Sequence, residues 1–162
     1  MIDYIALMNY FENHKRLKKL VLFLNRFITV AIYISYFLFL GIAYYFKSEH
    51  LLKYIFIPAI MFALVSVFRY FYNAPRPYEL YDFTPIYNKK TVGKSFPSRH
   101  VFSAFIISLM MLHFNTLLGI VFLILSTILA VVRVLAGVHF IKDVIAGALI
   151  SVLSFILMII IL

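Results

Sequence analysis

The chain has 162 residues, of which 65% are hydrophobic and only 13% are charged. A soluble domain is about half apolar and a quarter charged, so this composition and a mean hydropathy of +1.02 exclude a soluble globule. Fifteen Lys and Arg against six Asp and Glu give a net charge of +9, which in so apolar a chain indicates anionic or phosphorylated lipids as partners and no nucleic acid.

The N-terminal segment differs from the rest of the chain. Apolar and polar side chains alternate over its first part, and a basic cluster follows at Lys15–Lys19. This pattern is typical of an amphipathic segment that lies in the membrane interface. We therefore predict an interfacial segment at residues 1–19, which is no removable signal peptide because no small-residue cleavage site follows it.

Five long apolar runs follow, and each approaches the roughly 20 residues that a membrane-spanning helix needs. Ser95 is a suitable N-cap for the third run, with Pro97 in its first turn. The fold class expected is therefore all-α: a single integral membrane helical bundle over residues 1–162, with its termini on opposite faces. The predicted spans cover residues 20–46, 54–72, 97–112, 117–135 and 140–162.

A polar stretch, residues 73–94, separates the second and third spans. Its prolines Pro75, Pro77 and Pro85 argue against a helix here, so we predict a loop. With an up-and-down bundle, this loop lies on the same membrane face as the start of the third span and the turn around Gly137.

Ionisable side chains are concentrated on that membrane face. Ionisable groups near membrane depth are expensive and usually mark function, and here they lie at the ends of spans far apart in the sequence. A water-filled polar pocket would tolerate them, whereas lipid would not. The candidate site residues are Arg69, Arg76, Ser98, Arg99, His100, Arg133, His139 and Asp143.

These residue types fit phosphoryl transfer. On a helix, His139 and Asp143 share a face at spacing i, i+4, so the carboxylate can hold one imidazole nitrogen and leave the other to attack. His100 can protonate a leaving oxygen, and guanidinium groups suit phosphate oxygens. This set describes a phosphohistidine route and requires neither metal nor cofactor.

The same residues resemble the type 2 phosphatidic acid phosphatase (PAP2) superfamily of membrane lipid phosphatases. Its blocks K-x6-R-P, P-S-G-H and S-R-x5-H-x3-D correspond in order to three segments of this chain. These segments are Arg69-x6-Arg76-Pro77, Pro97-Ser98-Arg99-His100 and Arg133-x5-His139-x3-Asp143.

The resemblance implies a role for each matched residue. His139 would be the nucleophile, Asp143 its partner and His100 the general acid. Phosphate would be bound by Arg69, Arg76, Ser98 and Arg133, with Arg99 beside them.

Three positions depart from the family blocks. Arg69 replaces Lys, and Val132 replaces the Ser before Arg133. Arg99 replaces Gly and adds a bulky cation, for which lipid-headgroup contact, support of the site and plain solvation are all open readings. None of the three changes deletes a catalytic group.

The resulting hypothesis is a metal-independent lipid phosphatase of a bacterial cell membrane. Its candidate substrates are undecaprenyl diphosphate, phosphatidylglycerol phosphate and phosphatidic acid, with the last ranked lowest. A phosphotransferase with the same site, and a non-catalytic protein that binds anionic lipid, are the alternatives.

Two arguments about orientation conflict. The resemblance places the site on the extracytoplasmic face, whereas Lys15–Lys19 and the loop lysines Lys89, Lys90 and Lys94 point that face to the cytoplasm by the positive-inside rule. Part of the loop charge serves phosphate and distorts the count, whereas the N-terminal cluster does not. We favour the extracytoplasmic face on the resemblance.

Overall fold

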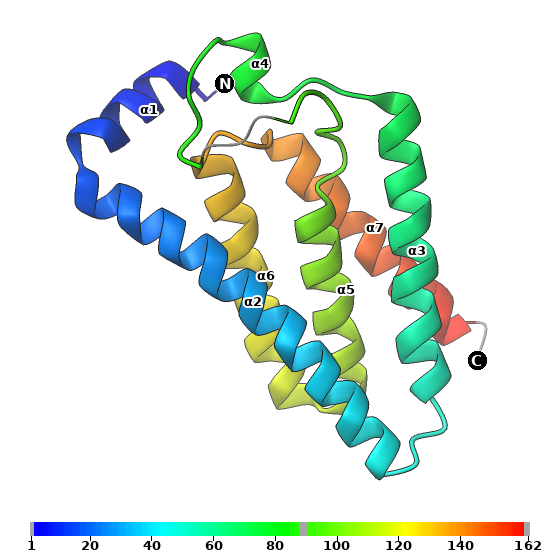
Figure 1. Cartoon of the computed structure of the whole chain (residues 1–162). Coiled ribbons are helices and arrows are strands. Elements are labelled where there is room, and N and C mark those ends of the chain that lie inside the picture. Colours follow the sequence, from blue (N-terminus) through cyan, green and yellow to red (C-terminus); the bar gives the residue numbers. More distant parts are fainter. Residues whose placement is uncertain (1, 88–90, 161–162) are drawn as a thin grey trace.

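The computed structural model describes residues 2–87 and 91–160, and every regular element among them is a helix (Figure 1). The structure does not describe residue 1 of the predicted interfacial segment, residues 88–90 of the predicted loop or residues 161–162 of the last predicted span. Lys89 and Lys90 are therefore outside the described residues. The helices are α1 (Tyr4–Asn13), α2 (Lys15–Tyr45), α3 (Leu51–Tyr72), α4 (Pro77–Leu80), α5 (Arg99–Phe114), α6 (Thr116–Leu135) and α7 (Ile141–Ile160).

The long helices form a bundle. Among the described residues, α2, α3, α6 and α7 are long and apolar enough to cross a membrane. Many of their large apolar side chains are exposed, such as Phe37 at 70% and Phe71 at 79%, and lipid is the natural solvent for such a surface. The predicted membrane helical bundle is confirmed, and the protein is a multi-pass membrane protein.

Helix α5 lies at the centre of the bundle and is shorter than the four helices α2, α3, α6 and α7. Its 16 residues rise only about 24 Å, less than the roughly 30 Å hydrocarbon core. It contacts α2, α3, α6 and α7, and most of its side chains from Val101 to Met111 are buried. Because protein surrounds it, α5 can end short of the membrane boundary without exposing its backbone to lipid.

Glycines allow two of these contacts to be close. A Cβ on Gly147 of α7 would lie 2.8 Å from the carbonyl oxygen of Ser98, at the start of α5. A Cβ on Gly119 of α6 would lie 2.1 Å from Cα of Leu112 in α5. Small residues at such crossings let membrane helices approach backbone to backbone.

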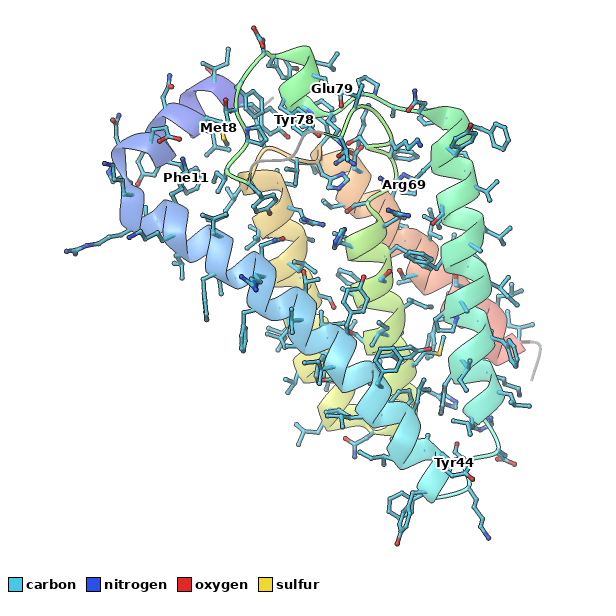
Figure 2. All side chains as sticks on the ribbon, in the orientation of Figure 1. Met8, Phe11, Tyr44, Arg69, Tyr78 and Glu79 are labelled. Carbon is cyan, nitrogen blue, oxygen red and sulfur yellow. The ribbon has the colours of Figure 1, made fainter. Side chains whose placement is uncertain are left out.

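The loop between α3 and α5, the turn between α6 and α7, and α1 lie at one end of the bundle (Figure 1). Helix α1 covers this end: Met8 and Phe11 pack in a cluster with Ile86 of the loop and Val138 of the turn. Figure 2 shows Met8 and Phe11 on the inner side of α1. The loop and the turn were predicted to share a face, and they share this end, which we call the site end.

Lys15–Lys19 of the predicted interfacial segment form the start of α2, and their place in the membrane interface stays a prediction. Two other local predictions are corrected. The loop contains the four-residue helix α4, which Pro77 permits because it occupies the first helical position, where no N–H is needed.

The second correction concerns the start of α5. Its N-cap is Ser98 and its first helical residue is Arg99, so Ser95 is not the cap and Pro97 lies outside the helix. Ser95 is held elsewhere, because its N–H donates to the carbonyl oxygen of Ala74 at 2.9 Å. Tertiary contacts thus override the local capping preference.

Candidate active site

A pocket of about 380 Å³ opens at the site end between α3, the loop and the start of α5. Five of the eight predicted site residues line it, although they come from four separate parts of the chain. The lining residues are Ser66, Arg69, Tyr70, Arg76, Thr91, Val92, Gly93, Lys94, Arg99, His100 and His139.

His139 precedes α7, and Asp143 lies in the first turn of that helix. Nδ1 of His139 is 3.3 Å from Oδ2 of Asp143. The two groups meet as expected, but they do not share a helix face, because His139 lies in the turn before α7. The backbone N–H of Phe140 donates to the same Oδ2 at 3.0 Å. With Nδ1 directed at the carboxylate, Nε2 is the nitrogen left for chemistry.

The His139 ring is almost completely buried, with 1% exposure. Burial lowers the pKa of His139 from 6.5 to about 3; the charges of Arg133 and Arg76 also lower it, whereas the hydrogen bond with Asp143 raises it. The imidazole is therefore neutral at neutral pH, which is the form that can attack.

Ser95 is a site residue that sequence reasoning missed. Its hydroxyl donates to Oδ2 of Asp143 and lies 3.4 Å from Nδ1 of His139. The side chain is fully buried. The only sequence signal at Ser95 is its place two residues before Pro97, and this pattern predicts a helix cap.

Arg69, at the end of α3, holds the loop before α5. It is buried, and its guanidinium donates to the carbonyl oxygens of Ser95 at 2.9 Å, of Pro97 and of Lys94. Figure 2 shows it at the site end, on the side of α3 that faces α5. Because an arginine side chain has five N–H donors, these three bonds leave two without a partner among the described residues.

Arg76 holds the loop to the turn before α7. Its Nε donates to the carbonyl oxygen of Gly93 at 2.9 Å, Nη1 to that of Val138 at 3.0 Å and Nη2 to that of Lys94 at 3.2 Å. Within residues 2–87 and 91–160, two of its five N–H groups also have no bond. Both arginines are thus fixed by the backbone before any ligand arrives, and both line the pocket.

Ser98, Arg133 and Asp143 are buried and do not line the pocket. Nη1 of Arg133 donates to Oδ1 of Asn25 at 3.2 Å, and its guanidinium lies 5.8 Å from the ring centre of Tyr87. Among the described residues, its Nε and Nη2 have no hydrogen-bond partner. Arg133 therefore contacts α2 and the loop in this structure.

Ser98 connects α5 to α7 through its backbone. Its N–H donates to the carbonyl oxygen of Asp143 at 2.9 Å. The hydroxyl oxygen has no partner within the described part of the chain.

Arg99 and Lys94 bring further positive charge to the pocket. Lys94 is exposed and lines the pocket, with its amine 4.7 Å from the ring centre of Tyr70. Arg99 is exposed and donates to the hydroxyl of Ser66 at 3.3 Å. Over residues 2–87 and 91–160, no group of three or more His, Cys, Asp or Glu side chains is arranged to hold a metal ion.

Comparison with protein families gives one match. The model of the PAP2 superfamily matches residues 50–162, more than two-thirds of the chain. This range contains every predicted site residue. The search of curated proteins found no match.

The fold is shared with solved structures, of which two are described. Aquifex aeolicus LpxE superposes with a TM-score of 0.69 and 26% identity, covering 89% of this chain and 93% of that one. A transmembrane PAP2-type phosphatidylglycerolphosphate phosphatase from Bacillus subtilis has a TM-score of 0.70 and 20% identity, with coverages of 90% and 76%. At the lower identity the likeness is one of fold.

Proposed function

Because the chain belongs to the PAP2 superfamily, we propose that it is a membrane lipid phosphatase that works through a phosphohistidine on His139. One observation carries this proposal: two histidines, His100 and His139, line a single pocket together with Arg69 and Arg76. The contact between His139 and Asp143 supplies the orienting carboxylate.

In the first step, Nε2 of His139 attacks phosphorus and the bond to the lipid-side oxygen breaks. His100 gives its proton to that oxygen, so the leaving oxygen departs as a hydroxyl group. In the second step, His100 removes a proton from water, which attacks the phosphohistidine. Inorganic phosphate leaves and His139 regains its electron pair.

Arg69 and Arg76 line the pocket, and we propose that their guanidinium groups donate to the phosphoryl oxygens, on which negative charge develops in both steps. Fixed donors need no reorganisation during the reaction, which is how such sites stabilise a transition state. We propose that these cations take the part that a metal ion has in other phosphatases, so that catalysis needs no metal.

The substrate is proposed to be a lipid, because the pocket lies at the end of a bundle whose sides face hydrocarbon. The Bacillus subtilis neighbour is named for phosphatidylglycerolphosphate, which is one of the candidates from the sequence. Undecaprenyl diphosphate and phosphatidic acid complete the set.

The test is phosphate release from these lipids in detergent with EDTA present. Wild-type protein should release phosphate from at least one of them, and His139→Ala should lower the rate by about 10³-fold or more because the nucleophile is gone. His113→Ala is the matched control, since this histidine bonds Tyr54 at 2.7 Å and does not line the pocket. It should retain activity.

Normal rates in His139→Ala, or activity that EDTA abolishes, would contradict the proposal. Labelled phosphate that appears on an acceptor lipid would identify a phosphotransferase. A protein that never becomes labelled would be a non-catalytic lipid-binding protein.

A further inference from the structure

The pocket carries more positive charge than one phosphoryl group needs. Four of its lining residues are cationic, namely Arg69, Arg76, Lys94 and Arg99, and no Asp or Glu is among the described residues that line it. A phosphoryl group carries a charge of about −1.5 to −2 at pH 7. Charge complementarity therefore favours a ligand with a second anionic group.

Arg99 differs from the two buried arginines. Arg69 and Arg76 are each bonded to three backbone carbonyl oxygens beside His139, which suits them to the phosphoryl group under attack. Arg99 is exposed, and its described contacts are to α3. It donates to Ser66 and its guanidinium lies 5.4 Å from the ring centre of Phe62.

An apolar groove of about 350 Å³ lies between α2, α3 and α5, and Phe62 is part of it. The other lining residues are Tyr33, Tyr36, Phe37, Pro58, Ala59, Phe102, Ser103, Ile106 and Ile107. Ser103 follows Arg99 by one turn of α5, as Ser66 follows Phe62 by one turn of α3. The pair Arg99 and Phe62 therefore joins the charged pocket to the groove.

From this geometry we infer that Arg99 selects lipids with two phosphoryl groups by binding the group nearer the hydrocarbon tail. The tail lies in the groove, the nearer phosphoryl group meets Arg99, and the terminal group meets Arg69, Arg76 and His139. This inference rests on the proposed function and narrows its substrates. It includes a prenyl diphosphate and a phosphatidylglycerolphosphate, and it excludes phosphatidic acid as the preferred substrate.

The experiment compares two pairs of lipids with matched tails in detergent. One pair is a prenyl monophosphate and the prenyl diphosphate; the other is phosphatidic acid and phosphatidylglycerolphosphate. Wild-type protein should have the higher kcat/KM on the two-phosphoryl member of at least one pair. The pair that shows the preference identifies the source of the second phosphoryl group.

Arg99→Gln should lower that preference about tenfold or more, mainly through KM, because a hydrogen-bonded charge is lost from substrate binding. Arg99→Lys should keep part of the preference, since the charge remains. Lys142→Gln is the matched control: it removes a cation from the site end that lies 5.4 Å from the ring centre of Phe140 and does not line the pocket. It should leave the preference unchanged.

Phosphate release with no preference for two phosphoryl groups would overturn the inference and leave the proposed function standing. An equal loss on both members of each pair in Arg99→Gln would do the same. A wild-type protein that releases phosphate from none of the four lipids would overturn both.

Discussion

The Oδ2 atom of Asp143 accepts hydrogen bonds from three donors. These are Nδ1 of His139 at 3.3 Å, the N–H of Phe140 at 3.0 Å and the hydroxyl of Ser95. Two of the donors are close in sequence, and the third comes from the loop before α5. The orientation of the carboxylate, and through it of the His139 ring, therefore depends on Ser95.

Removing the Ser95 hydroxyl should slow catalysis more than it weakens binding. We expect Ser95→Ala to lower kcat by about tenfold, because a hydrogen bond to a charged group contributes about 1.5–3 kcal/mol and its loss here affects the nucleophile. KM for the lipid should change little, and Ser95→Thr should restore part of the rate. Steady-state phosphate release measures both constants.

Ser154→Ala is the control, since this hydroxyl is also buried but donates to the carbonyl oxygen of Ile150 within α7. A positioning role would be contradicted if Ser95→Ala raised KM by as large a factor as it lowered kcat, and if Ser154→Ala gave the same changes.

At the scale of elements, the contact between α5 and α7 determines how the site is assembled. Gly147 lets α7 approach the first turn of α5, and the N–H of Ser98 bonds the carbonyl oxygen of Asp143 at 2.9 Å. This close contact between α5 and α7 brings His100 of α5 into the lining of the pocket that His139 also lines. A change in this spacing thus alters both packing and site geometry.

Gly147→Ala should therefore lower both stability and activity. Its Cβ would lie 2.8 Å from the Ser98 oxygen and 3.2 Å from the Phe102 nitrogen, both backbone atoms, and overpacking of this kind costs about 1–3 kcal/mol. Thermal unfolding in detergent and phosphate release report the two losses.

Gly41→Ala is a matched control, because among the described residues no atom beyond the neighbouring residues and backbone of α2 itself lies within 4 Å of the Cβ position at Gly41. Alanine should leave its Tm equal or slightly higher, since it favours helix by about 1 kcal/mol over glycine. A Gly147→Ala protein as stable as Gly41→Ala would show that the helices can separate without cost.

For the whole molecule, the resemblance and the positive-inside rule give opposite orientations of the bundle. α1, the loop and the candidate site share one end, and α7 leads away from it (Figure 1). The 31 residues of α2 rise about 46 Å, so Lys15–Lys19 at its start can lie outside the roughly 30 Å of hydrocarbon. Outside the hydrocarbon, these cations can bind lipid phosphates on either face of the membrane. The cluster is therefore weaker evidence for the orientation of the bundle.

We propose that the site end is extracytoplasmic and that α7 ends on the cytoplasmic side. A compartment-sensitive reporter fused after the last residue should then report the cytoplasm. A reporter at the N-terminus is the internal control and should give the opposite reading. The reverse pattern would place the site on the cytoplasmic face, in agreement with the positive-inside rule.

The bundle could be predicted from the sequence because its causes are local. Runs of apolar residues as long as a bilayer is thick allow only helices, so the membrane bundle followed from composition and length. The ordered segments around Arg69, His100 and His139 also identified the family, because spacing within a segment is a property of the sequence. The roles of those residues stay predictions that the experiments above test.

Only the tertiary structure decided the partners that lie far apart in the chain. Ser95 and Asp143 are separated by 48 positions, and Arg133 and Asn25 by 108. Hydrogen bonds at such separations depend on the path of the whole chain, which no local pattern encodes. For the same physical reason, the local pattern predicts a helix cap at Ser95, whereas in the structure its hydroxyl bonds the carboxylate of Asp143.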